Sequence, residues 1–247
     1  NFYALAGMDD VKHPDQIIGA LRGEFLVGPI EAAISASYGK DRPLRLGADL
    51  SAGIWLLDLR MEVAFAYDDD KPYWTAPRED AYRDLSDRWM PQLAAGAEIQ
   101  IMYTDQDFMV IGVEYFSNPR GYGSADLYDW LLLQTAMGKD AFTPFYLGQH
   151  YMAGYIMFPS PGSWNDTTIA LSGIGNLSDL TGLIRLNWQV KVLTYLDLAF
   201  FASARLGEKG EFHYGVSVPG GIPGLPKDGI NIYAPRLEFG VWATLAL

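Results

Sequence analysis

The 247-residue chain contains no cysteine, which excludes disulfide scaffolds, thiolate metal sites and thiol catalysis. It also lacks an uninterrupted apolar run near the ~18–20 residues of a membrane-spanning helix, because charges break every long candidate. Lys and Arg number only 18 against 30 Asp and Glu, and the net charge of −12 argues against a nucleic-acid partner. What the chain does have is apolar: 49% hydrophobic and 14% aromatic residues exclude a disordered protein.

The domain organisation is predicted to be a single unit over residues 1–247, because no linker and no internal repeat divides the sequence. The chain begins with Asn1, and its first residues do not form a basic segment followed by an apolar core. We therefore expect a mature or trimmed chain. A removed signal peptide and an origin as the C-terminal part of a longer precursor both stay open.

Between Arg45 and Tyr67 the sequence alternates apolar and polar residues with a period of two. Apolar side chains from Leu46 to Ile54 fall on one face, and Arg45, Gly47, Asp49, Ser51 and Gly53 fall on the other. The alternation resumes after Trp55 and continues to Tyr67. This period predicts two β-strands joined by a tight reversal.

The same alternation recurs along the chain and predicts about twelve antiparallel strands, most of them roughly 9–11 residues long. Short connections are expected at 27–29, 55–57, 104–107 and 193–195. They alternate with long loops, expected at 68–90, 117–145 and 207–234, the first of which could hold a charged helix at 78–88. Two connections depart from this alternation: 39–43 is short and 159–166 is long.

Two architectures share this pattern: a soluble sandwich or barrel with its apolar faces inward, and a transmembrane barrel with its apolar faces on lipid. Three features favour the second. Small residues such as Gly47, Ser51 and Gly96 separate the charges, as a confined lumen requires. Short and long connections alternate. Aromatic residues gather at the strand ends, as in interfacial girdles: Tyr38, Trp55, Tyr67, Tyr103, Tyr115 and Tyr195. We therefore expect an all-β, antiparallel, up-and-down transmembrane barrel.

The final segment, LEFGVWATLAL, keeps its apolar alternation to the last residue and resembles the closing strand of bacterial outer-membrane β-barrel proteins of the porin-like kind. That class usually ends in an aromatic residue, whereas this chain ends in Leu247. The resemblance implies an integral outer-membrane protein with both termini in the periplasm. Its implied partners are the lipid bilayer, lipopolysaccharide and small solutes, with a homo-oligomer or an envelope protein as further candidates.

The charged faces would line the lumen of such a barrel. Two compatible interpretations apply: cross-strand ion pairs that hold the wall together, and a constriction that selects solutes by charge and size. The nearly balanced signs argue against strong ion selectivity. The predicted lumen residues are Arg45, Asp49, Asp58, Arg60, Glu62, Glu98, Glu114, Arg185, Lys191, Asp197, Arg205, Arg236 and Glu238.

Within the long loop at 117–145, the sequence SADLYDWLLLQTAMG predicts a short helix with Ser124 as its N-cap and Gly138 after its end. The helix is too apolar to be left in water. It either folds into the barrel mouth or lies on the outer membrane surface. Its role is either that of a plug or packing element that stabilises the mouth, or that of a vestibule for amphipathic or aromatic solutes. The residues concerned are Tyr122, Leu127, Tyr128, Trp130, Leu131, Phe142 and Phe145.

No catalytic, metal or cofactor site is predicted. The histidines, His13, His150 and His213, show no spacing typical of a nucleophile–base pair or a metal site, so an outer-membrane enzyme is the least favoured interpretation. The sequence favours a porin-like channel for passive diffusion of small solutes, with the loop helix narrowing or capping the mouth. The alternative is a closed barrel that anchors or binds an envelope complex.

Overall fold

The computed structural model describes residues 1–7, 17–39, 42–136, 146–218 and 230–245. Within these ranges it describes the backbone alone at 42–43, 68–72, 86, 132–133, 135–136, 216–218 and 230–233. Twelve strands form one sheet, two more form a separate hairpin, and one helix lies between β7 and β8. The elements are β1 (Phe2–Gly7), β2 (Ile18–Val27), β3 (Ile30–Gly39), β4 (Arg42–Ile54), β5 (Leu57–Trp74), β6 (Tyr82–Met102), β7 (Phe108–Ser117), α1 (Asp126–Ala136), β8 (His150–Pro159), β9 (Thr167–Asn176), β10 (Thr181–Leu193), β11 (Leu196–Leu206), β12 (Gly215–Val218), β13 (Ile230–Tyr233) and β14 (Leu237–Leu245).

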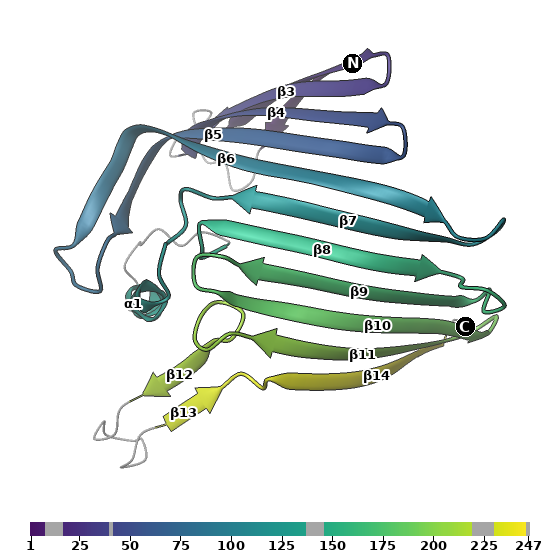
Figure 1. Ribbon diagram of the computed structural model, residues 1–247. Coiled ribbons are helices and arrows are strands. Elements are labelled where there is room, and N and C mark those ends of the chain that lie inside the picture. The colour runs from purple at the N-terminus through teal and green to yellow at the C-terminus, as the bar shows by residue number, and fades with distance from the viewer. Residues whose placement is uncertain (8–16, 40–41, 137–145, 219–229, 246–247) are drawn as a thin grey trace.

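The main sheet is an antiparallel meander in which each strand pairs with its neighbours in the chain, in the order β1 to β11 and then β14. This confirms the prediction of an all-β fold with twelve strands. Within the described residues β1 and β14 do not pair with each other, so the expected closed ring is not formed. The sheet is instead a curved wall with two free edges (Figure 1).

The connections sort onto the two ends of the sheet (Figure 1). One end carries the turns that follow β2, β4, β6, β8 and β10, and we call it the turn end. The opposite end carries α1 and the β12–β13 hairpin, and we call it the loop end. Asn1 lies beside Glu24 near the β2–β3 turn, and Leu245 is opposite Leu196 next to the β10–β11 turn. Both described ends of the chain therefore lie at the turn end.

The segment between Tyr67 and Met90 differs from its prediction. Instead of a long loop with a helix at 78–88, β5 and β6 continue past Tyr67 as a bent hairpin that turns only at residues 75–81. Register shifts at Tyr67/Asp69 and Asp69/Tyr73 bend this extension. The prediction of a long solvated loop was wrong, and the charged helix that the loop could have held is not formed either. Trp74, Ala81 and Leu85 bury apolar side chains in the extension, a gain that local charge patterning does not reveal.

The two faces of the sheet have different chemistry. Cross-strand partners share a face, so the register places the apolar alternate residues of all twelve strands on one side, which we call the outer face. Its large side chains are exposed: Leu50 44%, Val113 48% and Leu171 45%. No second layer of described residues covers them.

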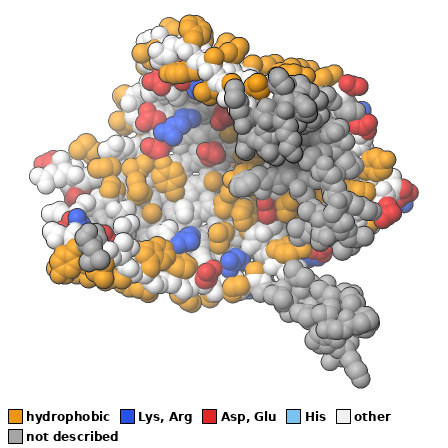
Figure 2. Space-filling view, turned by 180° about the vertical axis from the view of Figure 1, so that it is seen from behind, with side chains coloured by type: hydrophobic (Ala, Val, Ile, Leu, Met, Phe, Trp, Pro, Cys, Tyr) orange, Lys and Arg blue, Asp and Glu red, His pale blue; other side chains and the backbone are white. Residues whose placement is uncertain are grey.

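The opposite side, the inner face, carries the charges, and Figure 2 shows Lys, Arg, Asp and Glu side chains lying in its hollow. Buried strand residues such as Ala33, Val110, Ala199 and Ser203 belong to this face. The sheet is thus inverted relative to a water-soluble protein. No helix in the described part of the chain combines the length and apolarity that a membrane crossing requires.

Candidate functional site

The inner face brings together all but one of the predicted lumen residues. Asp49 lies opposite Glu62, Asp58 opposite Glu98, and Lys191 opposite Asp197. Arg45, Arg60, Glu114, Arg185, Arg205 and Glu238 occupy the same face by register. Arg236 is the exception, because it precedes β14 and contributes its backbone carbonyl, which accepts a hydrogen bond from the Arg205 N–H at 2.8 Å.

Near β2 the inner face holds an ion-pair cluster that the sequence interpretation missed. Arg22 reaches Asp49 with two hydrogen bonds, Nη1 to Oδ2 at 2.8 Å and Nη2 to Oδ1 at 3.2 Å, and its Nε donates to Glu24 Oε1 at 3.0 Å. The side chains of Arg22 and Asp49 are 41% and 40% exposed. The ion pair therefore fixes these two side chains relative to each other but adds little to the stability of the sheet. The alternation of Arg22 with Leu21 and Gly23 was the signal that could have identified it.

A groove with a volume of about 260 Å³ occupies the middle of the inner face. Its floor is made of small residues, Gly96, Gly112, Ala153 and Gly173. Around this floor stand Asp58, Arg60, Glu98, Glu114 and Tyr155. The Tyr155 hydroxyl donates a hydrogen bond to Glu98 Oε2. Four predicted constriction residues from three strands, β5, β6 and β7, therefore share one recess with Tyr155 of β8, a grouping that β-alternation alone does not reveal.

Three charges of this groove are available to a solute. Among the described residues, neither Asp58, Arg60 nor Glu114 forms an ion pair within 4.0 Å. Cross-strand ion pairing, the first interpretation of the lumen charges, therefore applies to Arg22–Asp49 on one side of the sheet and Arg205–Glu238 on the other. Among the described residues it leaves the charges of the central groove without an ion-pair partner. Charges in this state require hydration or a bound partner, since an unpaired dry charge is costly.

The wall formed by β10, β11 and β14 holds its cations differently. Arg205 pairs with Glu238 at 3.3 Å and donates to the Pro235 carbonyl at 2.7 Å. Arg185 has no such carboxylate: its guanidinium lies 4.2 Å from the centroid of the Phe201 ring, and its Nε donates to Asn187 Oδ1 at 2.9 Å. Arg185 is therefore held in place while its charge stays unneutralised.

Charge is unevenly distributed around the inner face. From β2 to β7 the regular strand segments carry three cations, Arg22, Arg45 and Arg60, against seven carboxylates: Glu24, Glu31, Asp49, Asp58, Glu62, Glu98 and Glu114. β8 and β9 carry no inner-face charge, and β10 to β14 carry Arg185, Lys191 and Arg205 against Asp197 and Glu238. The sequence predicted nearly balanced charges in the lumen, but the structure separates them into an acidic wall and a weakly basic wall. Arg22, Glu24 and Glu31 are inner-face charges that were not predicted.

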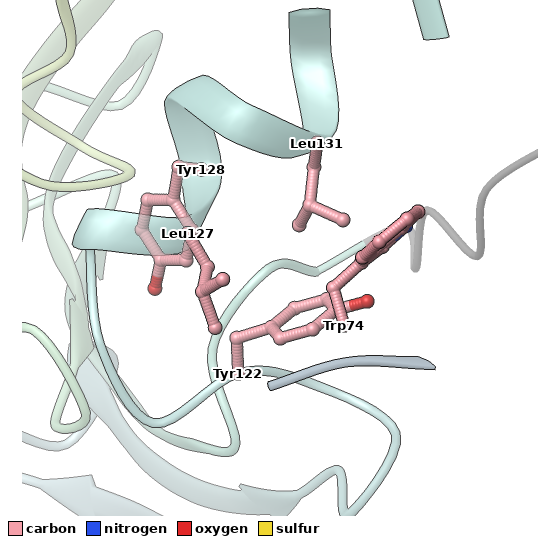
Figure 3. Close-up of a cluster of buried hydrophobic side chains, with 5 residues drawn as sticks. All are labelled: Trp74, Tyr122, Leu127, Tyr128 and Leu131. Carbon is pink, nitrogen blue, oxygen red and sulfur yellow. The ribbon is translucent and has the colours of Figure 1, made fainter. Parts of the chain in front are cut away.

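At the loop end α1 forms as predicted, and the Ser124 hydroxyl accepts a hydrogen bond from the Asp126 N–H at 3.2 Å in the manner of an N-cap. Four of the predicted vestibule residues are buried in one cluster with Trp74 of the β5–β6 extension: Tyr122, Leu127, Tyr128 and Leu131 (Figure 3). Trp130 packs against Trp74 with ring centroids 5.7 Å apart, while Phe142 and Phe145 lie outside the described residues. The cluster has the geometry of a packing element.

A buried polar network fastens this cluster to the inner face. Asn176 Nδ2 lies 3.2 Å from the Tyr128 hydroxyl, 3.0 Å from Asp179 Oδ2 and 3.0 Å from Glu211 Oε2. The Tyr151 hydroxyl also donates to Glu211, and burial is the main cause of the raised pKa of Tyr128. None of these residues except Tyr128 was predicted, because their partners are distant in the sequence and meet only through the turn after β9 and the loop after β11.

Asp129 connects the exposed side of α1 to the same loop. Lys209 Nζ donates to Asp129 Oδ2, and the Tyr214 hydroxyl donates to Oδ1 at 2.7 Å. Partial burial opposes ionisation of Asp129, but these hydrogen bonds and the charge of Lys209 lower its pKa overall. Burial and the bond to Asp129 raise the pKa of Tyr214 to about 12. We call these three residues the Asp129 clamp.

The described histidines have ordinary partners. His150 Nδ1 lies 2.8 Å from the Tyr115 hydroxyl, and His213 Nδ1 lies 2.9 Å from the Gly207 carbonyl, whereas His13 lies outside the described residues. The described part of the chain contains no group of three or more His, Asp or Glu side chains arranged to hold a metal ion. Comparisons with protein-family models, curated proteins and solved structures find no match to this chain.

Proposed function

We propose that the chain is an outer-membrane β-barrel whose inner face forms a passage for small polar solutes. The observation that carries this proposal is the inverted sheet: its outer face is apolar and uncovered, and its inner face is charged and grooved. Such an outer face needs lipid as its solvent, because water would leave a large apolar surface exposed. The sheet then closes by pairing β1 with β14. This pairing provides hydrogen bonds to the backbone N–H and C=O groups of both edges, which lipid cannot supply.

The dimensions of the outer face support a membrane position. Ten residue intervals separate Leu57 from Tyr67 on β5. At about 3.3 Å each and a tilt of roughly 40°, they span about 25 Å, which is the height of the apolar band of outer-membrane barrels. Trp55, Tyr103 and Tyr195 are exposed at the turn end and Tyr38 at the loop end, as interfacial aromatics would be. In this orientation the turn end and both termini face the periplasm.

A closed barrel that acts as an anchor or partner-binding component is the second candidate. Its support is the packing at the loop end, where α1 and the buried network around Asn176 cover part of the inner face. The packed cluster favours α1 as a cap of the mouth rather than as a greasy vestibule. The contacting partners would then be lipopolysaccharide and an envelope protein or second copy at the loops.

Conductance in planar bilayers separates the two candidates. A passage lined by the acidic wall should conduct and favour K⁺ over Cl⁻, because focused negative charge concentrates cations. Neutralising Glu98 and Glu114 to Gln should move the reversal potential in a salt gradient toward zero, whereas Arg60→Gln should move it away from zero. Glu208→Gln, at an exposed loop position, is the matched control. Folded protein that inserts without current would overturn the channel proposal and leave the closed barrel.

A further inference from the structure

On the inner face, the part of one row of cross-strand neighbours that runs from β5 to β10 has opposite charges at its two ends. Beyond β10 the row continues through Ser203 to Glu238, whose carboxylate pairs with Arg205. Running perpendicular to the strands, the row contains Asp58, Glu98, Gly112, Tyr155, Ser172 and Arg185 on β5 to β10. Two carboxylates stand at the β5–β6 end and a guanidinium at the β10 end. Between them lie only a glycine, a phenol and a hydroxyl. The row is therefore a fixed dipole laid across the wall of the proposed passage.

The basic end of the row is suited to a carboxylate. Arg185 forms no ion pair within 4.0 Å among the described residues, although Phe201 and Asn187 hold it in position. Its cross-strand neighbours Ser172 and Ser203 offer hydroxyl groups on either side. A preorganised guanidinium with free donors favours the planar, bidentate binding of a carboxylate.

The acidic end of the row is suited to an ammonium group. Asp58 and Glu114 line the central groove without an ion-pair partner in the described chain, and Glu98 accepts only the Tyr155 hydroxyl. An ammonium group brings three donors and a positive charge, which matches several carboxylate oxygens converging on one recess. The small residues Gly96 and Ala153 in the floor of the groove leave space for it beside the wall.

We propose that the passage selects zwitterionic solutes, with short peptides as the best match, their ammonium group at the Glu98 end and their carboxylate at Arg185. This inference rests on the proposed channel function. Four strand intervals separate Glu98 from Arg185, on the order of 19 Å along the sheet. Curvature of the sheet and the reach of both side chains shorten the distance between the charges. Three extended residues span about 10 Å, so a tripeptide is the probe of choice.

The test is a liposome-swelling comparison of four probes of nearly equal size: triglycine, N-acetyl-triglycine, triglycine amide and N-acetyl-triglycine amide. Triglycine should enter about 1.5- to fivefold faster than each singly capped form, the factor expected from one charge contact at a hydrated site. Equal entry of the four probes would overturn the zwitterion proposal while leaving the channel intact. Entry of none would overturn the channel proposal and this inference with it.

Variants assign the two ends of the row. Arg185→Gln should remove the preference for triglycine over triglycine amide, and Arg185→Lys should restore part of it. Glu114→Gln should reduce the preference over N-acetyl-triglycine. Arg78→Gln, which removes an exposed cation in the turn between β5 and β6, is the control and should change neither. Heat-modifiable gel mobility confirms that each variant is folded, and unchanged preference in folded Arg185→Gln would contradict the proposal.

Discussion

Gly112 lies on the inner face, where its lack of a side chain leaves room for the ring of Tyr155. A Cβ on Gly112 would lie 2.3 Å from Cε1 of Tyr155, so the ring can lie across β7 only because the residue is glycine. In that position the Tyr155 hydroxyl reaches Glu98 and separates the acidic end of the groove from Ser172 and Arg185. One glycine thus positions a central element of the proposed passage.

Gly112→Ala should therefore force the Tyr155 ring away from β7. We expect a loss of about 1–3 kcal/mol in the free energy of unfolding, the range for inserting a methyl group into a packed contact. Urea unfolding of protein reconstituted in lipid measures it. Gly19→Ala is the control, because a Cβ there meets no atom within 4 Å. Equal stability of the two variants would show that the Tyr155 contact does not constrain the wall.

The alternation of charged and apolar residues made part of the site predictable from the sequence. Asp58, Arg60, Glu98 and Glu114 were identified because a charge that alternates with apolar residues must share a face with its neighbours. Their gathering around one groove depends on strand register, which a period of two leaves undetermined. Asn176, Glu211 and Tyr151 were missed because hydrogen bonds that join the ends of β8 and β9 to the loop after β11 leave no periodic signal.

Among the elements, α1 is held at the loop end by the apolar cluster with Trp74 and by the Asp129 clamp. Because the pKa of Asp129 is lowered in the folded protein, its ionised form stabilises the docked loop. This contribution is complete above the unfolded pKa of about 3.9 and is lost as the pH falls through the lowered folded value. The side chains of Asp129 and Lys209 are about half exposed, so we expect the ion pair to contribute less than about 1 kcal/mol to the stability of the docked loop.

Pepsin cleavage of the α1 loop should consequently accelerate as the pH is lowered below about 4, in excess of the intrinsic change in protease rate. Asp129→Asn should show faster cleavage already at pH 4.5 and a flatter dependence below it. Asp105→Asn, at the turn end and away from the clamp, is the control for charge removal. A pH profile of Asp129→Asn that matches the parent chain would exclude a role for the clamp.

The elements themselves were predicted well where alternation is long. β10, expected at 181–192, is found at Thr181–Leu193, and β11 was predicted with its observed limits. The β5–β6 extension was missed because acidic residues at 68–70 and charged residues at 78–80 are typical of loops. Trp74 of the extension is buried in a cluster with Tyr122 and with residues of α1, which lie about fifty residues later in the chain, and this is tertiary information.

For the whole molecule, the open edges of β1 and β14 are the feature that the proposed barrel must resolve. Because the chain contains no cysteine, a disulfide can form only between cysteines that are introduced for the test. Cysteine pairs combining Ala4 or Ala6 with Val241 or Ala243 place both thiols on the outer face of the edge strands. At least one pair should form an intramolecular disulfide in membranes, since paired strands bring Cα atoms within the roughly 4.4–6.8 Å that a disulfide needs.

The matched control replaces Ala4 by its cross-strand partner Leu21 on β2, keeping the same β14 position. That pair is one strand further apart and should stay reduced as an intramolecular bond. Disulfide-linked dimers from the β1–β14 pairs, in place of the intramolecular product, would show that the edges pair with a second copy and would contradict a monomeric closed ring.

The central claim, that lipid covers the outer face and water the inner one, is tested most directly by spin labels placed one at a time at residues 59–64 of β5 in proteoliposomes. We predict strict alternation: labels at Leu59, Met61 and Val63 should be more accessible to oxygen, and labels at Arg60, Glu62 and Ala64 more accessible to a water-soluble nickel chelate. Protection of the Leu59, Met61 and Val63 labels from both reagents, as in a protein core, would contradict the account.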